Sequence, residues 1–582
     1  MGFFWTIVAF VVVLAFTWRY LGSYMEAVFD GRVRFLSWVE RPFYRLLRTD
    51  PAHEQTWKRY ASSLVVFSGL FLAFGYLLLR VQGSLPLDPQ RLGAVPPALS
   101  FNTIVSFVTN TNWQNYGGET TMSYFSQIGV LTVQQFVSAA VGIAVAVAVV
   151  RGLTRRGSET IGNFWVDITR CLLYILLPIA FVVGVVLVSQ GAVQTLAGPV
   201  TVHDALNGVT QTIPRGPVAF MGSIMQLGTN GGGFFNADLA HPFENPTALT
   251  NLLYIWCTLS IPFALTYTFG KMAGSVRQGA ALLAAMVVIF GVWVGFSSYA
   301  EHRPNPAVAA AGVSAQPTGN MEGTNVRFGD TSSALFDVAN TQTSNGGVDS
   351  SIDSFNAMAG FGALSGMMLG EVSPGGVGSG LYTILLFAIV AVFIGGLMIG
   401  RTPEYLGKKI QAREVKLAGL GILVMPVVVL VLTGIAVSIH AGRAGPLNAG
   451  PHGFSEILYA FTSQANNNGS AMAGLTGNHA FYNVTGAVAM LLGRFGVIVP
   501  SLALAGGLCK KGVVPTSEGT FRTDSTMFVG LVIGVILIVG GLTFFPAVAL
   551  GPIATALSHR FYSVVVVLGH AGLLLARVVG LR

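Results

Sequence analysis

Long apolar runs almost free of charge constrain this chain more than any other feature of its sequence. A helix needs about 20 apolar residues to cross the hydrocarbon core of a bilayer. Ten runs are long enough to serve as such helices: roughly 2–18, 60–79, 126–150, 171–190, 252–270, 279–298, 380–400, 417–440, 482–508 and 527–549. We therefore predict an all-α integral membrane protein with about ten transmembrane helices.

Composition excludes several classes of protein. Hydrophobic residues make up 52% of the chain and charged residues only 10%, against about 25% charged residues in a typical soluble domain. So few charges cannot cover a water-exposed surface, which excludes a soluble enzyme, a disordered protein and a nucleic-acid-binding protein. The three cysteines, Cys171, Cys257 and Cys509, are far apart and lack a CxxC spacing, which argues against a disulfide framework or a zinc site built from them.

The few basic residues indicate how the chain crosses the membrane. Arg19 follows the first apolar run and no positive charge precedes it, so we expect an uncleaved anchor with its N-terminus outside. The segments then expected in the cytoplasm hold 22 of the 32 Lys and Arg residues, whereas the outer segments hold nine. Cytoplasmic loops of membrane proteins carry this excess, so the count supports the predicted orientation.

A short polar segment recurs in four outer loops. The four copies are FVTNTNWQ (107–114), MQLGTNGG (225–232), NTQTSNGG (340–347) and SQANNNGS (463–470). Aligned on Asn112, Asn230, Asn345 and Asn468, they are 118, 115 and 123 residues apart. This regular spacing indicates an internal repeat.

The surroundings of the four segments repeat as well. A stretch too short to cross the membrane leads into each segment: 100–108, 216–227, 330–342 and 454–465. Irregular backbone is tolerated at membrane depth only inside protein or beside water, so we expect four short re-entrant helices. The predicted fold has four fused helix–re-entrant pore loop–helix repeats around a pseudo-fourfold axis: 60–150, 171–270, 279–400 and 417–508.

The remaining residues lie outside the repeats. We expect an anchor helix and a cytoplasmic loop in 1–59, a final helix in 527–549 and a tail in 550–582. Within the tail, 561–579 suits an eleventh span and an interfacial helix equally well, because it is apolar but contains His570 and Arg577.

The chemistry of the repeated segments favours a weakly hydrated monovalent cation. Helix C-termini directed at an axis present partial negative charge, and the segments contain no carboxylate. Calcium sites use Asp and Glu, and magnesium gives up its water reluctantly, so a ring of neutral oxygens suits potassium best. The candidate filter residues are Asn110, Thr111, Asn112 and Gln114, then Thr229, Asn230, Gly231 and Gly232, then Ser344, Asn345, Gly346 and Gly347, and finally Asn466, Asn467, Asn468 and Gly469.

The third repeat contains a break and a charge within the membrane. As one helix, its residues 354–400 would extend roughly 70 Å, against a hydrocarbon core of about 30 Å. The glycines and the proline of GMMLGEVSPGGVGSG (366–380) interrupt helices, so we expect two half-helices joined by an unwound loop that carries Glu371. Intramembrane charges are usually paired. We therefore expect Glu371 to pair with Arg494, Arg401 or both and to hold the loop as a plug beneath the filter, with a purely structural ion pair as the alternative.

Three strings of the sequence, FVTNTNWQNY, GTNGGGFFNADLAHPFENPT and FTSQANNNGSAMAGLT, resemble the filter regions of the KdpA family. Members of this family are the potassium-binding subunits of bacterial Kdp potassium-transporting ATPases. The similarity extends from the first apolar run to about residue 557, and residues 558–582 look like an addition. It implies a potassium-channel-like fold of four helix–pore–helix repeats with two flanking helices, and a gating loop.

The resemblance also implies a role in ATP-driven potassium uptake across the bacterial inner membrane. The chain would bind potassium from outside and pass it sideways to a P-type ATPase subunit (KdpB-like). An accessory subunit (KdpC-like), a small single-span subunit (KdpF-like) and membrane lipid would be its other partners. A self-contained potassium channel or symporter of the same superfamily is the alternative, which the glycine-poor first segment and the long third repeat disfavour.

The sequence contains no ATPase motif. The stretch GRTPEYLGKK (400–409) has the wrong Gly-to-Lys spacing for a P-loop and no Ser or Thr after the lysine, and the DKTGT phosphorylation motif does not occur. We therefore expect a chain that binds no nucleotide and is not itself an enzyme.

Several residues beside the segments have predicted roles. We expect His241 and Glu244 in a folded loop that caps the outer side, with direct cover of the pore mouth as the alternative. Asp349 and Asp353 either attract cations or cap the following helix. Gln114 is the first candidate for a residue whose exchange alters ion selectivity, because its amide oxygen can point toward the axis.

Overall fold

The computed structural model of the chain describes residues 2–203, 208–313, 316–398, 400, 402–514 and 521–558. Within these ranges, ten helices are long and apolar enough to cross a membrane. They are α1 (Gly2–Phe29), α3 (Trp57–Arg80), η2 with α6 (Ser126–Thr132, Val133–Thr154), α7 with η3 and α8 (Phe164–Arg170, Cys171–Leu176, Leu177–Ser189), α10 (Ala248–Met272), α11 (Val276–Glu301), α15 (Ser379–Met398), α16 (Ala412–Ser438), α19 (Ala480–Cys509) and α20 (Thr526–Val548). The prediction of an all-helical membrane protein with ten spans is confirmed. The predicted tail segment 561–579 and Arg401 lie outside the described residues.

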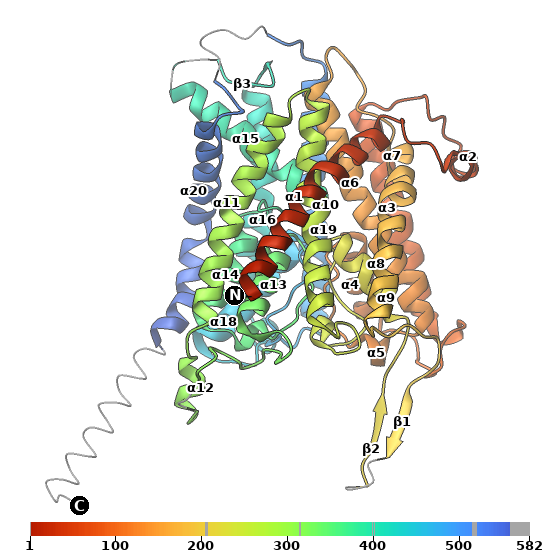
Figure 1. The fold of residues 1–582 in the computed structure, drawn as a ribbon, viewed down its shortest axis with the longest axis vertical. Coiled ribbons are helices and arrows are strands. Elements are labelled where there is room, and N and C mark those ends of the chain that lie inside the picture. Colours follow the sequence, from red (N-terminus) through yellow and green to blue (C-terminus); the bar gives the residue numbers. More distant parts are fainter. Residues whose placement is uncertain are drawn as a thin grey trace, which may run out of the picture.

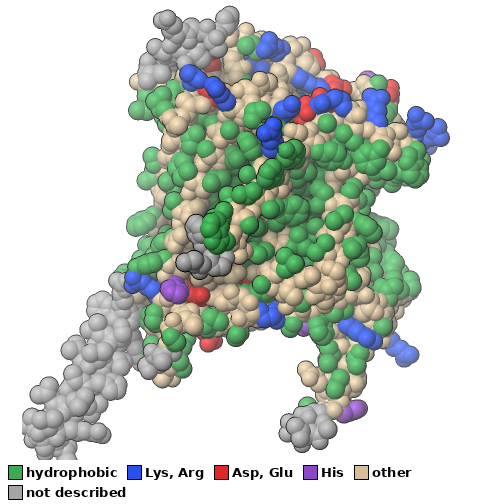
Figure 2. Space-filling view, in the orientation of Figure 1, with side chains coloured by type: hydrophobic (Ala, Val, Ile, Leu, Met, Phe, Trp, Pro, Cys, Tyr) green, Lys and Arg blue, Asp and Glu red, His purple; other side chains and the backbone are tan. Residues whose placement is uncertain are grey.

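The long helices run side by side along the longest dimension of the molecule (Figure 1). Hydrophobic side chains cover the middle of the surface, and most of the Lys and Arg side chains on the visible face gather at one end (Figure 2). That end carries α2 (Ser37–Leu46) and the two-residue strands β3 (Glu404–Tyr405) and β4 (Lys408–Lys409). An apolar belt with a basic end is the distribution that the sequence predicts for a membrane protein.

Five shorter helices lie in the half of the molecule away from the basic end (Figure 1). They are α4 (Pro97–Val108), α9 (Val218–Leu227), α13 (Gly329–Thr341), α14 (Ala357–Met368) and α18 (Gly450–Asn466). The same half carries the antiparallel hairpin of β1 (Val200–His203) and β2 (Thr210–Ile213), which extends away from the helices. Its other small elements are η1 (Gln82–Ser84), α5 (Gly118–Thr121), η4 (Asp238–Ala240), α12 (Pro306–Ala310), η5 (Ile352–Ser354), α17 (His440–Arg443) and η6 (Ala549–Ile553).

Helix α6 lies at the centre of the bundle and is almost completely buried. Most of its side chains are Ala, Val and Gly, and small residues allow neighbouring backbones to come close within a membrane. A Cβ atom on Gly142 would lie only 2.2 Å from the carbonyl oxygen of Val377. Residue 142 therefore must lack a side chain, because α6 packs directly against the stretch 369–378.

The stretch 369–378 separates α14 from α15, where the sequence predicts an unwound loop. Three hydrogen bonds of 2.8 Å attach it to the turns that follow α9 and α13: Gly375 N–H to Gln342 O, Ser373 Oγ to Gln342 Oε1, and Val377 N–H to Thr229 Oγ1. The loop is thus held directly against the turns that form the candidate site.

The basic end of the molecule is held together by buried charges. Lys408 Nζ donates to the carbonyl oxygens of Gly152 and Leu508 at 2.9 and 2.8 Å, near the C-terminal ends of α6 and α19. Arg151 and Asp167 form a buried ion pair at 2.7 Å. Cations at helix C-termini offset the negative ends of the helix dipoles, so these contacts fix α6, α7 and α19 relative to one another.

Candidate ion filter and the cavity beneath it

Four segments follow the C-terminal ends of α4, α9, α13 and α18, and we call them filter segments one (109–114), two (228–233), three (342–347) and four (467–470). In each segment one backbone N–H donates to the carbonyl five residues earlier: Thr111 to Ser106, Asn230 to Met225, Asn345 to Asn340 and Asn468 to Ser463, at 2.8, 2.8, 3.1 and 2.8 Å. The preceding residue has a positive φ in every segment: 66° at Asn110, 44° at Thr229, 52° at Ser344 and 57° at Asn467. The four helices therefore end in the same backbone turn.

This turn corrects the sequence alignment of the first segment. The sequence pattern aligns Asn112 with Asn230, Asn345 and Asn468, whereas the hydrogen bonds place Thr111 at that position. Asn112 then corresponds to the glycine that follows each of the other three asparagines. Its φ is 56°, in the left-handed region that Asn adopts more readily than most residues with a side chain. The first segment lacks a glycine because Asn112 takes its place.

The four segments form a closed ring. An added Cβ on Gly231 would lie 2.1 Å from Gly346 N, and one on Gly346 would lie 2.7 Å from Gly469 C. A Cβ on Gly469 would lie 1.9 Å from Thr111 O, and Asn112 Nδ2 donates to Gly231 O at 3.1 Å. Each segment thus contacts the next, and the fourth contacts the first. Only backbone fits between them.

The asparagine amides of the ring donate to groups outside their own segments, either in another segment or in the surrounding elements. Asn230 Nδ2 donates to Asn110 Oδ1 at 2.7 Å, Asn345 Nδ2 to Thr258 Oγ1 at 2.7 Å, and Asn468 Nδ2 to Glu371 Oε1 at 2.9 Å. In the same way, Asn467 Nδ2 donates to Thr111 Oγ1 at 2.9 Å. These asparagines are buried, and buried hydrogen-bond networks of this kind make a structure rigid. The asparagines therefore fix the spacing of the ring.

Two carboxylates of the loop that follows segment two hold the backbone beside segments two and three. Glu244 Oε1 accepts a hydrogen bond from Phe234 N–H at 2.9 Å, and Asp238 Oδ2 accepts one from Val348 N–H at 3.0 Å. His241 stacks on the ring of Phe235 with 3.7 Å between centroids. The loop 233–247 is thus a folded cap, as the first of the two sequence interpretations of His241 and Glu244 expects.

The other two acidic residues named from the sequence have separate neighbours. Asp349 Oδ2 accepts a hydrogen bond from Asn251 Nδ2 at 3.1 Å. Asp353 lies farther along the chain and contacts His452 at 2.7 Å. The two aspartates therefore bind different elements.

A cavity with about 60 Å³ of free space lies beneath the ring, enough for a few water molecules. Ser344, Asn466 and Asn467 line it from the filter side, together with Glu371 and Arg494. On its far side the lining includes Gly421 and Met425 of α16 and Gly540 and Thr543 of α20. The cavity therefore extends sideways from the base of the ring toward two long helices.

Glu371 and Arg494 both line this cavity but do not pair with each other. Glu371 has a positive φ of 49°, and its buried carboxylate accepts the hydrogen bond from Asn468. Arg494 Nη2 donates to Ser138 O at 2.9 Å. Among the described residues no ion pair joins the two, so Arg494 is not the partner of Glu371. The other predicted partner, Arg401, lies outside the described residues, and that part of the expectation stays a prediction. The left-handed backbone directs the carboxylate at segment four, while α19 directs the guanidinium at α6.

Comparison with known proteins places the chain in a family. A family model described as "KdpA: Potassium-transporting ATPase A subunit" matches residues 8–557. The chain belongs to the KdpA family. A relative from Methylobacterium nodulans, described as a potassium-transporting ATPase potassium-binding subunit, is 54% identical over 551 residues, covering 94% of this chain and 96% of the relative. A relative with the same description from Granulibacter bethesdensis is 53% identical over 553 residues, covering 94% and 97%.

The similarity to solved structures is weaker. The crystal structure of the potassium transporter TrkH from Vibrio parahaemolyticus has a TM-score of 0.48 and 16% sequence identity, covering 73% of this chain and 83% of that chain.

Membership in the KdpA family confirms the function predicted from the sequence. The chain is the potassium-binding subunit, and not the catalytic subunit, of a potassium-transporting ATPase. It is a multi-pass membrane protein that works with the other subunits of that ATPase.

Within this KdpA chain, the amide of Gln114 pairs with the backbone of segment two. Its Oε1 accepts a hydrogen bond from Gly233 N–H, and its Nε2 donates to Gly233 O, both at 3.1 Å. Sequence reasoning expected the Gln114 amide oxygen at the axis, but the geometry places it against segment two.

The sequence did not reveal the roles of Thr258 and Gln342. Thr258 binds Asn345, and Gln342 binds the unwound loop. Polar residues inside apolar helices are the signal that points to them.

Proposed function

We propose that the ring of filter segments binds potassium ions that have shed their water, mainly through backbone carbonyl oxygens. The observation that carries this proposal is the closed ring of four identical turns, each at the C-terminal end of a helix. Helix C-termini favour cations, and carbonyl rings replace the hydration shell of potassium. The amide nitrogens of Asn230, Asn345 and Asn468 donate to neighbouring groups, and the amide oxygens of Asn345 and Asn468 accept backbone N–H groups, which leaves mainly backbone oxygens for the ion. The side-chain oxygens of Asn112 and Asn230 have no hydrogen-bond partner among the described residues and would add to them.

We further propose that the ring arises from four fused repeats around a pseudo-fourfold axis. Each repeat would contain a long helix, a short helix with its filter segment, and a second long helix: α3–α4–α6, α8–α9–α10, α11–α13–α15 and α16–α18–α19. In the third repeat α14 and α15 form the broken second helix. Helices α1 and α20 lie outside the repeats and flank them. The common turn at the end of each short helix supports this division.

The charge distribution supports an orientation with the filter outside. The end of the molecule opposite the filter half is the one rich in Lys and Arg (Figure 2), and cytoplasmic ends carry such an excess. We infer that the short helices enter from the outer face of the bacterial inner membrane, with the N-terminus outside.

We infer that potassium leaves the ring sideways, into a P-type ATPase partner. The cavity beneath the ring extends to α16 and α20, so an ion there is directed toward a lateral surface. ATP hydrolysed in the partner would drive uptake, with an accessory subunit and a small single-span subunit completing the complex. The loop 369–378 would block the direct route, held by its bonds to Thr229, Gln342 and Asn468, and the charge of Arg494 would repel ions on that route.

One substitution tests the filter. In Gly346→Ala the new methyl group would meet the backbone of Gly469 at 2.7 Å, and overpacking of this kind costs about 1–3 kcal/mol. We expect the apparent potassium affinity of the purified complex, read from potassium-stimulated ATP hydrolysis, to fall at least about tenfold. Gly512→Ala is the control, because nothing lies within 4 Å of its added Cβ. An unchanged affinity in Gly346→Ala would contradict the proposed filter.

A second experiment separates the pump subunit from the alternative of a self-contained channel or symporter. Cells without other potassium uptake systems would express this chain, the accessory subunit and the small single-span subunit, with or without the P-type ATPase subunit. We expect growth at low potassium only when the P-type ATPase subunit is present. Growth without it would favour the channel or symporter.

A further inference from the structure

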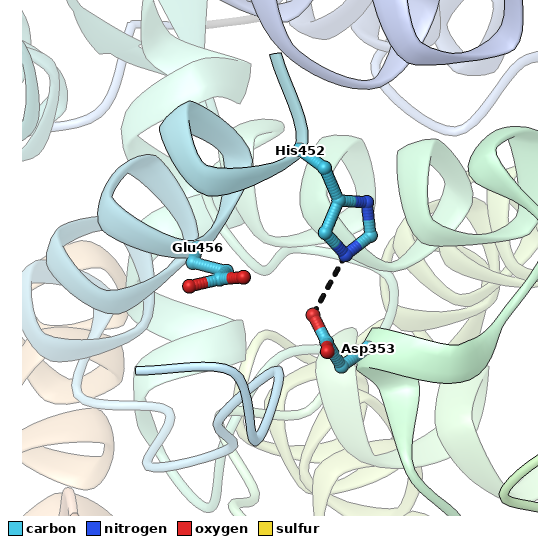
Figure 3. A group of neighbouring side chains, drawn as sticks. All are labelled: Asp353, His452 and Glu456. Atoms are coloured by element: carbon cyan, nitrogen blue, oxygen red, sulfur yellow. Dashed lines mark hydrogen bonds and ion pairs between the residues drawn. The ribbon is translucent and has the colours of Figure 1, made fainter. Parts of the chain in front are cut away.

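Three side chains of types that bind metals lie close together in the half of the molecule that contains the filter segments, outside those segments. His452 and Glu456 extend from α18, and Asp353 comes from η5 (Figure 3). His452 Nε2 lies 2.7 Å from Asp353 Oδ1, and one ligand atom from each of the three side chains lies within 4.8 Å of the others. The described residues contain one such group of three His, Cys, Asp or Glu side chains.

The backbone holds these side chains in place. Residues 452 and 456 are four apart on α18, which puts them on the same face of the helix. Asp353 is fixed from the other side, because its N–H donates to Met472 O at 2.7 Å. The Glu456 carboxylate is buried and accepts hydrogen bonds from Leu447 N–H at 2.9 Å and from Asn448 Nδ2 at 2.7 Å. Neither carboxylate therefore moves freely.

Gly474 packs directly against the two carboxylates. An added Cβ on Gly474 would lie 2.5 Å from Glu456 Oε1 and 2.7 Å from Asp353 Oδ1, so any side chain at this position would collide with both oxygens. The amide nitrogen of Asn448 bridges the same two groups, donating to Glu456 Oε1 at 2.7 Å and to Asp353 Oδ2 at 3.3 Å. Two negatively charged groups thus face one donor, and a cation that takes the place of this donor is stabilised by both.

We propose that Asp353, His452 and Glu456 form a binding site for a transition-metal dication of the zinc class. One imidazole nitrogen and two carboxylate oxygens are ligands that zinc takes in proteins, whereas calcium and magnesium prefer oxygen ligands alone. Tetrahedral zinc ligands at about 2.0–2.1 Å from the metal are about 3.3 Å apart. The ligand atoms of His452 and Asp353 are 2.7 Å apart, and no two ligand atoms of the three side chains are more than 4.8 Å apart. Small side-chain rotations therefore bring the three atoms to the spacing that zinc needs. Solvent supplies the fourth ligand, because the Asn448 amide faces the two carboxylates with its nitrogen.

The position of the site gives the metal a structural effect. η5 follows filter segment three, and α18 leads into filter segment four. A metal bound to Asp353 and His452 joins these two elements outside the ring. Binding to the folded state alone stabilises that state, so the metal raises the stability of the filter half.

The chain offers a matched control for this proposal. His302 Nδ1 and Asp330 Oδ2 form a similar pair at 2.8 Å, also on the filter half. Within the described ranges, no third His, Cys, Asp or Glu ligand completes this pair. An isolated His–Asp pair binds zinc weakly, because it supplies two ligands where a zinc site needs at least three.

The test uses the complete complex with its partner subunits, stripped of metal and dialysed against micromolar Zn²⁺. We expect the wild-type complex to retain one more zinc per chain than His452→Asn and Asp353→Asn, and His302→Asn to match the wild type. Zinc affinity at this site should fall at least tenfold in the two site variants. Equal zinc content in all four complexes, or an equal loss in His302→Asn, would overturn the proposal.

Potassium-stimulated ATP hydrolysis shows whether each variant assembles. A second measurement uses the wild type alone and so needs no variant to fold. Zn²⁺ should raise the unfolding temperature of the wild-type complex by several degrees, and Mg²⁺ at the same concentration should not. The absence of a zinc-specific shift also overturns the proposal.

Discussion

At the scale of single residues, the buried amides do more for the candidate filter than their sequence pattern suggests. Asn230, Asn345 and Asn468 each donate to a group outside their own segment. An apolar residue at any of these positions would leave an acceptor unsatisfied, which costs about 1–3 kcal/mol for a buried group. The same polarity that suggests ion ligands in the sequence therefore maintains the spacing at which backbone oxygens meet an ion.

Gln114 offers a test of this spacing. In Gln114→Met the side chain keeps its length but loses both hydrogen bonds to Gly233, so segments one and two should separate more easily. We expect the discrimination between K⁺ and Na⁺ in stimulating ATP hydrolysis to fall by about tenfold, equivalent to about 1.4 kcal/mol. Gln90→Met is the control, because Gln90 bonds to Glu119 O, away from the ring. Unaltered discrimination in Gln114→Met would argue against a role for this amide.

Glu371 offers a test of the plug. Glu371→Ala removes an acceptor for Asn468 Nδ2, whereas Glu371→Gln replaces the carboxyl group by an amide and keeps an oxygen. Because a hydrogen bond contributes about 0.5–1.5 kcal/mol, we expect passive ⁸⁶Rb⁺ leak through reconstituted complexes to rise about tenfold in the Ala variant and less in the Gln variant. Potassium binding should persist in both. Tight vesicles with Glu371→Ala would contradict a plug held by this contact.

At the scale of elements, the cap 233–247 over segment two depends on a neutral histidine. Burial lowers the pKa of His241 to about 4, and the nearby charge of Arg327 acts in the same direction. His241 Nδ1 accepts a hydrogen bond from Phe243 N–H at 3.1 Å, which a protonated ring cannot do. The folded cap therefore requires the unprotonated ring.

The pH dependence of the cap follows from this pKa. The histidine pKa is lower in the folded cap than its ordinary value of 6.5, so its contribution to stability is complete above pH 6.5 and is lost as pH falls toward 4. We expect hydrogen-exchange protection of 233–247, corrected for intrinsic rates, to decrease over this range. His241→Asn keeps an acceptor but does not titrate, so its profile should be flatter. A wild-type profile as flat as that of the variant would refute this role.

The elements also show what the sequence can and cannot predict. Apolar runs predicted the long helices, because their length is set by the bilayer, and Gly- and Asn-containing segments predicted where four short helices end. The register of segment one was not predictable, since Asn110 and Asn112 flank Thr111 and only the backbone turn distinguishes them. The partner of Glu371 was missed for a different reason. Asn468 lies 97 residues away, and contacts between distant elements leave no mark on local patterns.

At the scale of the whole molecule, the small number of charged residues allows the topology to be inferred from their positions. With charged residues at only 10% of the chain, most of the basic ones gather at a single end (Figure 2). Several of the buried basic residues have specific partners, such as Lys408, whose ammonium group donates to the carbonyl oxygens of Gly152 and Leu508. Three spans, α10, α11 and α15, separate the hairpin β1–β2 from the strand pair β3–β4 in the chain. This odd number places the two strand pairs at opposite ends of the molecule, which makes the orientation testable at two exposed positions.

Cysteine labelling tests that orientation directly. The native cysteines Cys171, Cys257 and Cys509 are buried and free, so a membrane-impermeant maleimide should react weakly with the wild-type chain, which serves as the control. Thr201→Cys on β1 and Lys409→Cys on β4 add thiols at exposed positions. Because basic loops stay in the cytoplasm, we expect intact spheroplasts to label only Thr201→Cys, and permeabilised ones to label both. Labelling of Lys409→Cys alone in intact spheroplasts would show that the chain has the opposite orientation. The filter would then face the cytoplasm, where it could not take up potassium from outside.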